Sequence, residues 1–288
     1  SETRIDCHNA GHDDVFAQVI GLSRFYRTYS TYGTYTTTNP IQTRLHLVER
    51  IGQVMIGTMS ANATAVLKDS YGRAIRDLRV SLTDRCNFRC FYCLPHGEPP
   101  IAPKEQMLSY EEIERACEIF VALGIEKIRL TGGEPMMRKD IETIIRKLSK
   151  LRNDGLTDLA LTTNGYFLPE RAQSLKEAGL DRITISLDSL KRDVFKKMTG
   201  VDVLDKVLAG IKAAKEAGLQ PIKINAVIVR GHNEDEVADF AAFAREHDVK
   251  MRYIEYMPLD SGHDWSRSDV VSGKEIRERI EERFPLAK

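Results

Sequence analysis

The sequence predicts an α/β fold in which parallel strands alternate with helices. Three observations predict it: strand-like and helical runs alternate from Arg76 onward, signals for helix starts and ends separate these runs, and 288 residues with 42% hydrophobic content can bury one barrel-sized core. Six βα units can be counted. Right-handed crossovers would curl them into an incomplete (β/α)6 TIM-type barrel or leave an open, doubly wound sheet, and the pattern does not choose between the two.

Each predicted strand is a short run rich in aliphatic and β-branched residues. The runs lie near 77–82, 126–131, 157–163, 181–187, 222–229 and 250–257. A helix is expected after each strand. Three pairs have the capping-box spacing of a helix start: Ser109 with Glu112, Asn233 with Glu236, and Ser272 with Glu275. Three glycines lie where left-handed helix C-caps are expected: Gly124, Gly179 and Gly218.

Side chains alternate between the two faces of a strand, and here the two faces differ in polarity. One face is aliphatic: Leu78, Val80, Leu82, Ile128, Leu130, Leu159, Leu161, Ile183, Ile185, Leu187, Ile222 and Ile224. The other is polar: Arg79, Ser81, Arg129, Thr131, Thr162, Thr184, Ser186, Asp188, Lys223 and Asn225. A polar inner face predicts a wet cavity, because closed barrels normally fill their interior with apolar residues. Three cations against one acid predict a phosphate-bearing ligand, unless this face simply meets solvent.

Composition narrows the function classes. The 42 basic and 42 acidic residues cancel, so overall charge does not favour nucleic acid or an anionic membrane as a partner. No run approaches the roughly 18 apolar residues of a membrane span, and we expect a soluble, cytoplasmic protein. Residues 1–58 include the low-complexity run from Tyr26 to Thr38 and predict a poorly ordered or non-native extension, whereas 59–288 predict the folded domain.

Three cysteines form the strongest signal in the chain. Cys86, Cys90 and Cys93 lie within eight residues directly after the first predicted strand. Three close thiolates can each bind one iron of a [4Fe-4S] cluster and leave the fourth iron open, whereas an electron-transfer cluster normally takes four cysteines. The open iron can chelate S-adenosylmethionine (SAM) for one-electron cleavage. The alternative is a structural zinc site that His96 completes.

Further motifs follow the ends of later strands, where α/β barrels keep their chemistry. Gly132, Gly133, Glu134 and Pro135 follow the second strand, and two glycines would let the backbone approach a ligand closely. The run 162–165, Thr-Thr-Asn-Gly, ends the third strand, and 186–188, Ser-Leu-Asp, ends the fourth.

The cysteine spacing, with Tyr92 before the last cysteine, resembles the signature of the radical SAM superfamily. From about Gly72 to about Phe284 the chain resembles more closely the GTP 3′,8-cyclase family (molybdenum cofactor biosynthesis protein A), above all in segments 72–95 and 252–257. The resemblance implies a partial barrel of the radical SAM type. It also implies a lyase that cleaves SAM reductively and converts GTP to 3′,8-cyclo-7,8-dihydro-GTP, the first step of molybdenum cofactor (molybdopterin) biosynthesis.

The resemblance assigns roles to particular residues, and it implies no catalytic side chain beyond the cluster and SAM. The cluster ligands would be Cys86, Cys90 and Cys93. The contacts to SAM would be Tyr92, Gly133, Ser186 and Met257. The contacts to GTP would be Arg79, Arg129, Thr162 and Lys223. Three of these last four are the cations that strand alternation places on the polar face.

The chain departs from the family pattern toward its C-terminus. Family members continue with three cysteines that hold a second [4Fe-4S] cluster, and they end in a glycine pair; this sequence contains neither. We therefore expect a C-terminally truncated member that cleaves SAM but holds GTP poorly. An electron donor and a second copy in a homodimer are the other expected partners. Two alternatives stay open: another radical SAM activity such as peptide modification, and a non-catalytic metal-binding fragment.

Overall fold

The structure, a computed structural model, describes residues 17–19, 66–93, 101, 103, 107–258 and 265–286. The extension predicted for 1–58 lies outside the described residues except for one strand, β1 (Ala17–Val19). This strand was not predicted, because three residues are too few to show alternation. It pairs in parallel with β2 (Asp77–Ser81).

The chain divides into two compact units. We call the first the β1–β3 unit; it comprises Asp14–Asp84 and Ile101–Ala160. The second, the β5–β7 unit, comprises Ser1–Asp13, Arg85–Pro100 and Leu161–Lys288. The strand β4 (Asp158–Thr163) lies between β3 and β5 in the strand order and crosses the boundary between the units.

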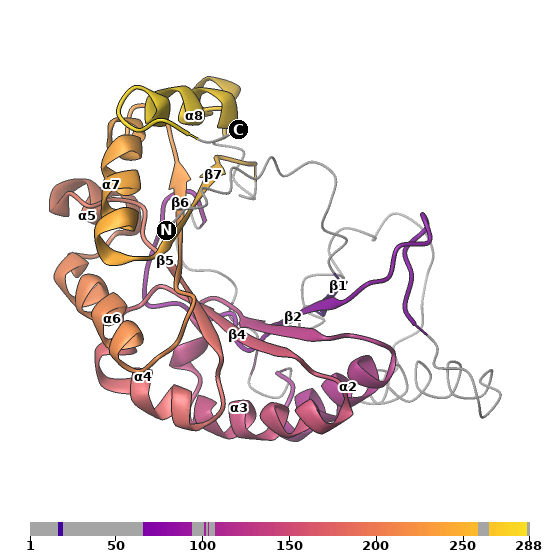
Figure 1. The fold of residues 1–288 in the computed structure, drawn as a ribbon. Helices are drawn as coiled ribbons and strands as arrows, with labels where there is room; N and C mark the ends of the chain where they lie inside the picture. The colour runs from indigo at the N-terminus through magenta and orange to yellow at the C-terminus, as the bar shows by residue number, and fades with distance from the viewer. Residues whose placement is uncertain are drawn as a thin grey trace. The chain divides into compact units, whose positions relative to one another are not determined.

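The β1–β3 unit is a parallel sheet with helices packed beneath it (Figure 1). Its strands β2 and β3 (Lys127–Thr131) pair in a register that places Leu78 beside Ile128 and Arg79 beside Arg129. The helical segments are α2 (Tyr110–Ala122), η2 (Pro135–Met137), α3 (Ile141–Ser149) and η3 (Lys150–Asp154). Apolar and polar strand positions therefore line up across the sheet, which separates its two faces.

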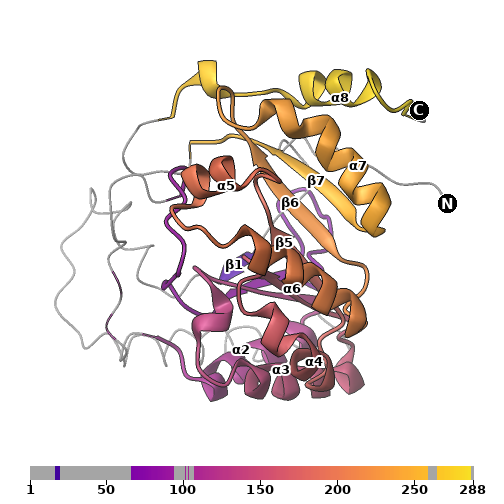
Figure 2. The same ribbon diagram turned by 90° about the vertical axis from the view of Figure 1, so that its left-hand side faces the viewer.

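In the β5–β7 unit, the parallel strands are β5 (Arg182–Ser186), β6 (Lys223–Ile228) and β7 (Lys250–Glu255). Helices α6 and α7 cover one face of this sheet (Figure 2). The helices are α4 (Leu168–Glu177), α5 (Arg192–Thr199), α6 (Leu204–Glu216), α7 (Val237–His247) and α8 (Gly273–Glu281), with short turns η4 (Glu234–Glu236) and η5 (Arg267–Asp269). Each strand leads into a helical segment, as the alternation predicted.

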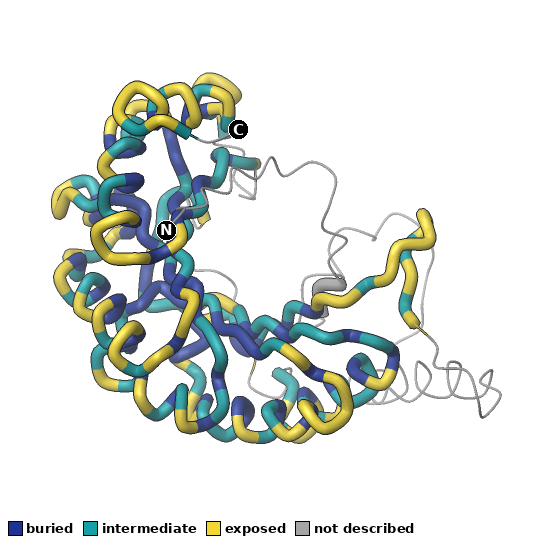
Figure 3. Tube along the Cα trace, in the orientation of Figure 1, coloured by how far each residue is buried: buried dark blue, intermediate teal, exposed yellow. Residues whose placement is uncertain are grey.

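All six predicted strands are confirmed within two residues at each end. Every residue of the predicted aliphatic face is at most 4% exposed, whereas most of the polar face is half-buried (Figure 3). Two members of the polar face are instead almost fully buried, Thr184 and Asp188. The predicted glycine caps are confirmed by positive φ at Gly124, Gly179 and Gly218. The hydrophobic pattern thus determined which side of each strand faces the helices.

The three predicted capping boxes have different outcomes. The Ser109 box is complete: its hydroxyl accepts from the Glu112 N–H at 3.1 Å, and the Glu112 carboxylate accepts from the Ser109 N–H at 2.6 Å. The Ser272 hydroxyl accepts from the Glu275 N–H at 3.2 Å, but the Glu275 carboxylate binds Arg230 at 2.6 Å instead of returning to the cap.

The prediction of a box at Asn233 and Glu236 is wrong. The Asn233 side-chain oxygen accepts from the Val229 N–H at 2.8 Å, and the Glu236 carboxylate accepts from the Ser189 hydroxyl at 2.7 Å. Neither side chain caps a helix, since the nearby Val229 N–H takes the Asn233 oxygen and Ser189, on a distant segment, takes the Glu236 carboxylate.

The turn after β3 depends on a close backbone approach. Gly132 has φ +151, and a Cβ atom there would lie 2.5 Å from the Thr83 carbonyl oxygen. The same oxygen accepts the Gly133 N–H at 2.7 Å. The close approach to Thr83 is by itself enough to require glycine at position 132.

We predict that Gly132→Ala lowers the free energy of unfolding by about 3 kcal/mol, from backbone strain and the clash with Thr83. Gly155→Ala is the matched control, because Gly155 has φ +117 and a Cβ atom there would meet none of the described residues within 4 Å. This variant therefore measures only the cost of a positive φ for a residue with a Cβ atom, about 1 kcal/mol. Chemical denaturation measures both, and equal losses would contradict the assigned contact.

We also predict a pH-dependent role for Glu275 on α8. Hydrogen bonds from Arg230 and Arg279 lower the pKa of Glu275 from 4.5 to about 2. A lowered folded-state pKa contributes stability above pH 4.5, and this contribution disappears as pH falls through about 2. Glu275→Gln should lower Tm at pH 7 by about 2 °C and have no effect near pH 2. Glu278→Gln, at an exposed pair with Lys274 on the same helix, is the control; an equal Tm loss there would contradict the assignment.

Candidate functional site

The cysteine loop packs against the end of α5 in the β5–β7 unit. Its backbone donates hydrogen bonds from the Arg89 N–H to the Thr199 carbonyl at 2.9 Å and from the Phe91 N–H to the Met198 carbonyl at 3.1 Å. A turn closes from the Cys93 N–H to the Cys90 carbonyl at 3.0 Å. These hydrogen bonds fix the backbone between the cysteines.

Aromatic residues between the cysteines anchor the loop. Phe88 is 4% exposed and meets Phe195 edge-to-face, with ring centroids 6.0 Å apart. Phe91 stacks on His232 at 4.7 Å and packs against the apolar cluster that contains Tyr256. Because these side chains provide the burial, Cys86 and Cys90 stay half-buried and Cys93 stays exposed.

The Cys90 thiol does not ionise readily on its own. Burial, and then the nearby charge of Asp188, raise the pKa of Cys90, although a hydrogen bond with Tyr92 opposes the shift. A thiolate in such surroundings needs a cation to compensate its charge, and iron bound there would provide one. The Phe88 N–H also points at the Cys86 sulfur at 3.4 Å, which is a donor position suited to a cluster thiolate.

The spacing of the three thiols along one loop suits an iron–sulfur cluster. Within the described part of the chain, no three His, Cys, Asp or Glu side chains are grouped so as to hold one metal ion. In an iron–sulfur cluster each thiolate binds a different iron, so three thiols along one loop need not converge on a point. His96, the fourth ligand of the zinc alternative, lies outside the described residues.

Polar side chains at the strand ends contact this loop. Asn164, at the end of β4, donates from its side-chain nitrogen to the Asn87 side chain at 2.8 Å and lies 4.0 Å from the Cys86 sulfur. After β5, the Asp188 carboxylate accepts from the Tyr92 hydroxyl at 2.6 Å. The third and fourth predicted strand-end motifs thus lie against the cysteine loop, as expected for a parallel α/β site.

Asp188 has a role that the sequence did not predict. We expected it as the acid facing three cations, but its other carboxylate oxygen accepts from the Val227 N–H at 2.9 Å. Burial raises the pKa of Asp188 to about 6, against the hydrogen bonds from Tyr92 and Val227. Asp188 is therefore engaged with the cysteine loop and β6.

The other predicted site residues divide between the two units. In the β1–β3 unit, Arg79 and Arg129 are register neighbours on one face, and Gly133 follows β3. In the β5–β7 unit, the half-buried residues are Thr162, Ser186, Lys223 and Met257. Ser186 is the register neighbour of Asn225, and the Asn225 side-chain oxygen is a buried acceptor without a hydrogen-bond partner in the described residues. Such an acceptor suits a site for a polar ligand.

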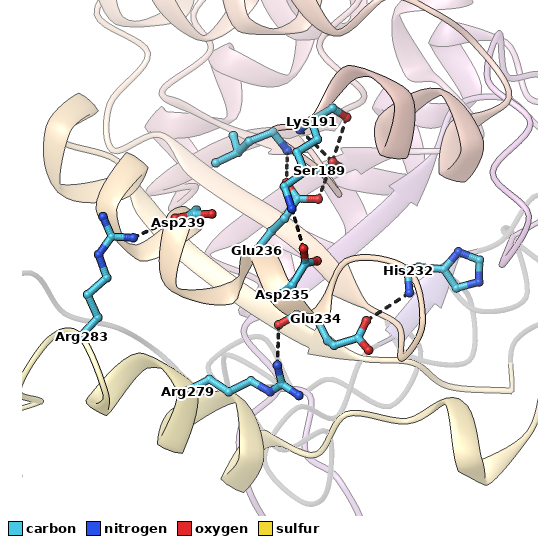
Figure 4. A network of polar contacts seen from close by, with 10 residues as sticks. Ser189, Lys191, His232, Glu234, Asp235, Glu236, Asp239, Arg279 and Arg283 are labelled. Atoms are coloured by element: carbon cyan, nitrogen blue, oxygen red, sulfur yellow. Dashed lines mark hydrogen bonds and ion pairs between the residues drawn. The ribbon is translucent and has the colours of Figure 1, made fainter.

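Sequence reasoning also missed the buried groups behind the loop. Asn233 and Glu236 are fully buried, and Glu236 binds Ser189 (Figure 4). The available signal was their place after β6, since side chains at the carboxyl ends of parallel strands gather at one edge. Their spacing suggested a helix cap instead.

Comparisons with known proteins identify the family of this chain. The family model of the radical SAM superfamily matches residues 80–244. The GTP 3′,8-cyclase of Acidothermus cellulolyticus is 46% identical over 228 residues, which cover 77% of this chain and 62% of that protein. The mitochondrial GTP 3′,8-cyclase of Arabidopsis thaliana is 40% identical over 98% of this chain and 70% of its own length. The chain thus spans about two thirds of these relatives.

Solved structures share the fold. Streptococcus suis SuiB bound to S-adenosylmethionine has a TM-score of 0.57 and 16% identity, over 87% of this chain and 54% of that one. The predicted fold class, an incomplete (β/α)6 TIM-type barrel of the radical SAM type, is confirmed by this likeness together with the parallel strand order. None of the described helices has the length and apolar character needed to span a membrane.

The superfamily match covers more than half of the chain and includes the loop of three cysteines, and the curated relatives extend the likeness to both units. The chain belongs to the radical SAM superfamily, whose members use SAM and a [4Fe-4S] cluster, and within it to the family of the GTP 3′,8-cyclases.

Proposed function

We propose that this chain is a radical SAM GTP 3′,8-cyclase, which converts GTP to 3′,8-cyclo-7,8-dihydro-GTP in molybdenum cofactor biosynthesis. One observation carries the proposal: a loop of three cysteines, anchored by its aromatic residues, lies within a chain that is 40–46% identical to curated GTP 3′,8-cyclases. The likeness continues far beyond the loop, and it includes strands whose polar faces carry cations.

The cluster and SAM would be held mainly by the cysteine loop and the strand ends. Cys86, Cys90 and Cys93 are the proposed cluster ligands. The proposed SAM contacts are Tyr92, Gly133, Ser186 and Met257. When bound, the cluster and SAM would supply the one-electron radical chemistry that acts on the ribose of GTP. The protein's part is to orient the bound molecules and to keep water away from them.

The proposed GTP contacts are Arg79, Arg129, Thr162 and Lys223. Arg79 lies beside Arg129 in the register of β2 and β3, and Lys223 lies beside Lys250 in the register of β6 and β7. Arginine and lysine side chains at these positions can donate charge-assisted hydrogen bonds to triphosphate oxygens. Their placement on the polar faces of the strands supports an anionic substrate.

Several further properties belong to the same proposal. An electron donor must reduce the cluster. A second copy of the chain, in a homodimer, is the other proposed partner, and a measurement of molecular mass in solution tests it. The second cluster of the family would need ligands outside this sequence. We propose a cytoplasmic location, while the name of the Arabidopsis relative places that protein in mitochondria. A fluorescent fusion of the chain distinguishes the two compartments.

We predict that the anaerobically reconstituted chain, given dithionite and SAM, forms 5′-deoxyadenosine. Replacing the three loop cysteines by alanine should abolish both the cluster absorbance and this product. With GTP added, the cyclised nucleotide is scored separately by mass spectrometry. GTP is supplied in large excess, because we expect this chain to hold GTP poorly. Cleavage of SAM without any GTP-derived product under that condition would reject the cyclase and favour another radical SAM activity. A colourless, zinc-bound protein would favour a non-catalytic metal-binding fragment.

We further predict that Lys223→Met weakens GTP binding about tenfold, because one charge-assisted contact to phosphate is lost. Lys212→Met is the matched control: it removes the same charge from an exposed side chain of α6 in the same unit. Isothermal titration on the reconstituted protein measures both. Equal losses in the two variants would show that only overall charge matters.

A further inference from the structure

Asp188 connects the cysteine loop to two strands. Its side chain is 3% exposed, and its two carboxylate oxygens have different partners. One accepts from the Tyr92 hydroxyl at 2.6 Å, and the other accepts from the Val227 N–H at 2.9 Å. Because Asp188 follows β5 and Val227 lies in β6, one carboxylate joins the loop to both strands.

Hydrogen bonds with two buried side chains hold the backbone around Asp188 in place. The Asn233 side-chain nitrogen donates to the Asp188 carbonyl at 2.6 Å and to the Val227 carbonyl at 2.9 Å. Next along the chain, the Glu236 carboxylate accepts from the Ser189 hydroxyl and the Leu190 N–H, each at 2.7 Å (Figure 4). These groups are fully buried and satisfied, so they hold the segment in one arrangement.

Tyr92 connects Asp188 to the part of the loop that carries the thiols. It lies between Cys90 and Cys93, and its ring packs with Phe91 against the apolar cluster of Met198, Val229 and Tyr256. The packing confines the ring, while the hydrogen bond to Asp188 determines where the hydroxyl end lies. The turn that bears both thiols is therefore fixed at two points, one apolar and one polar.

We propose that Asp188 is a positioning residue for the cluster and SAM: through the Tyr92 hydroxyl it fixes the turn that carries Cys90 and Cys93. In this proposal Asp188 acts on the geometry of the cluster and SAM through Tyr92, whose hydroxyl donates to its carboxylate. The proposal rests on the radical SAM chemistry of the chain and not on GTP as the substrate.

Three variants test it in the reconstituted full chain. Tyr92→Phe removes only the hydroxyl, and Asp188→Ala removes both hydrogen bonds. Asp188→Asn keeps them, since its oxygen can accept from Val227 and its amide can donate to the Tyr92 oxygen. We expect Tyr92→Phe and Asp188→Ala to assemble the cluster, to bind SAM about tenfold more weakly, and to lose the SAM-induced change in the EPR spectrum of the reduced cluster. Asp188→Asn should restore both readouts.

The double variant and a control separate positioning from general stability. If the pair acts through its hydrogen bond, Tyr92→Phe should add little to the SAM affinity loss of Asp188→Ala. Tyr253→Phe removes another buried hydroxyl of the same unit, which donates to the Val237 carbonyl at 2.8 Å. It should lower Tm without changing SAM affinity or the EPR spectrum.

Four outcomes would overturn the proposal. The first is that Tyr92→Phe keeps the SAM affinity and EPR spectrum of the wild type, and the second is that Asp188→Asn is as impaired as Asp188→Ala. The third is that the losses of SAM affinity add up in the double variant. The fourth is that Tyr253→Phe loses as much SAM affinity as Tyr92→Phe. None of these readouts requires turnover of GTP. A wild-type chain that makes no cyclised nucleotide would therefore reject the proposed substrate and leave this test intact.

Discussion

Three thiols on one short loop can bind a cluster only if other groups hold the backbone around them, and this constraint organises the β5–β7 unit. Phe88 and Phe91 supply the apolar anchors, on Phe195 and His232. Loop N–H groups bind carbonyls at the end of α5. The loop is thus anchored mainly by residues that lie between the cysteines, and not by the cysteines alone.

The buried polar groups behind the loop follow from the same constraint. Asp188, Asn233 and Glu236 are at most 3% exposed, and a buried polar group without a partner costs roughly 1–3 kcal/mol. Each of the three has partners on segments that are distant in sequence. A satisfied network of this kind contributes less to stability than to the selection of a single loop geometry, because misplacing any member leaves another group unpaired.

The strand faces place a different demand on the fold. Helices cover the aliphatic faces, which leaves the polar faces to carry Arg79 beside Arg129 and Lys223 beside Lys250. Within the described residues, the buried side-chain oxygen of Asn225 has no hydrogen-bond partner, and Asn225 is the register neighbour of Ser186. A polar ligand would satisfy that oxygen, and an apolar barrel interior would have no such acceptor.

Local patterns in the sequence determined the six later strands, their two-sided polarity, the cysteine loop and the Ser109 capping box. In each of these, the interacting positions lie a few residues apart or repeat with the period of a strand, so spacing alone identifies them. Only the tertiary structure decided the partners of Asp188, Asn233 and Glu236. Tyr92 lies 96 residues from Asp188, and Ser189 lies 47 from Glu236. Spacing cannot predict such pairs, because buried side chains bind whichever distant segment the packing of strands and helices brings to them.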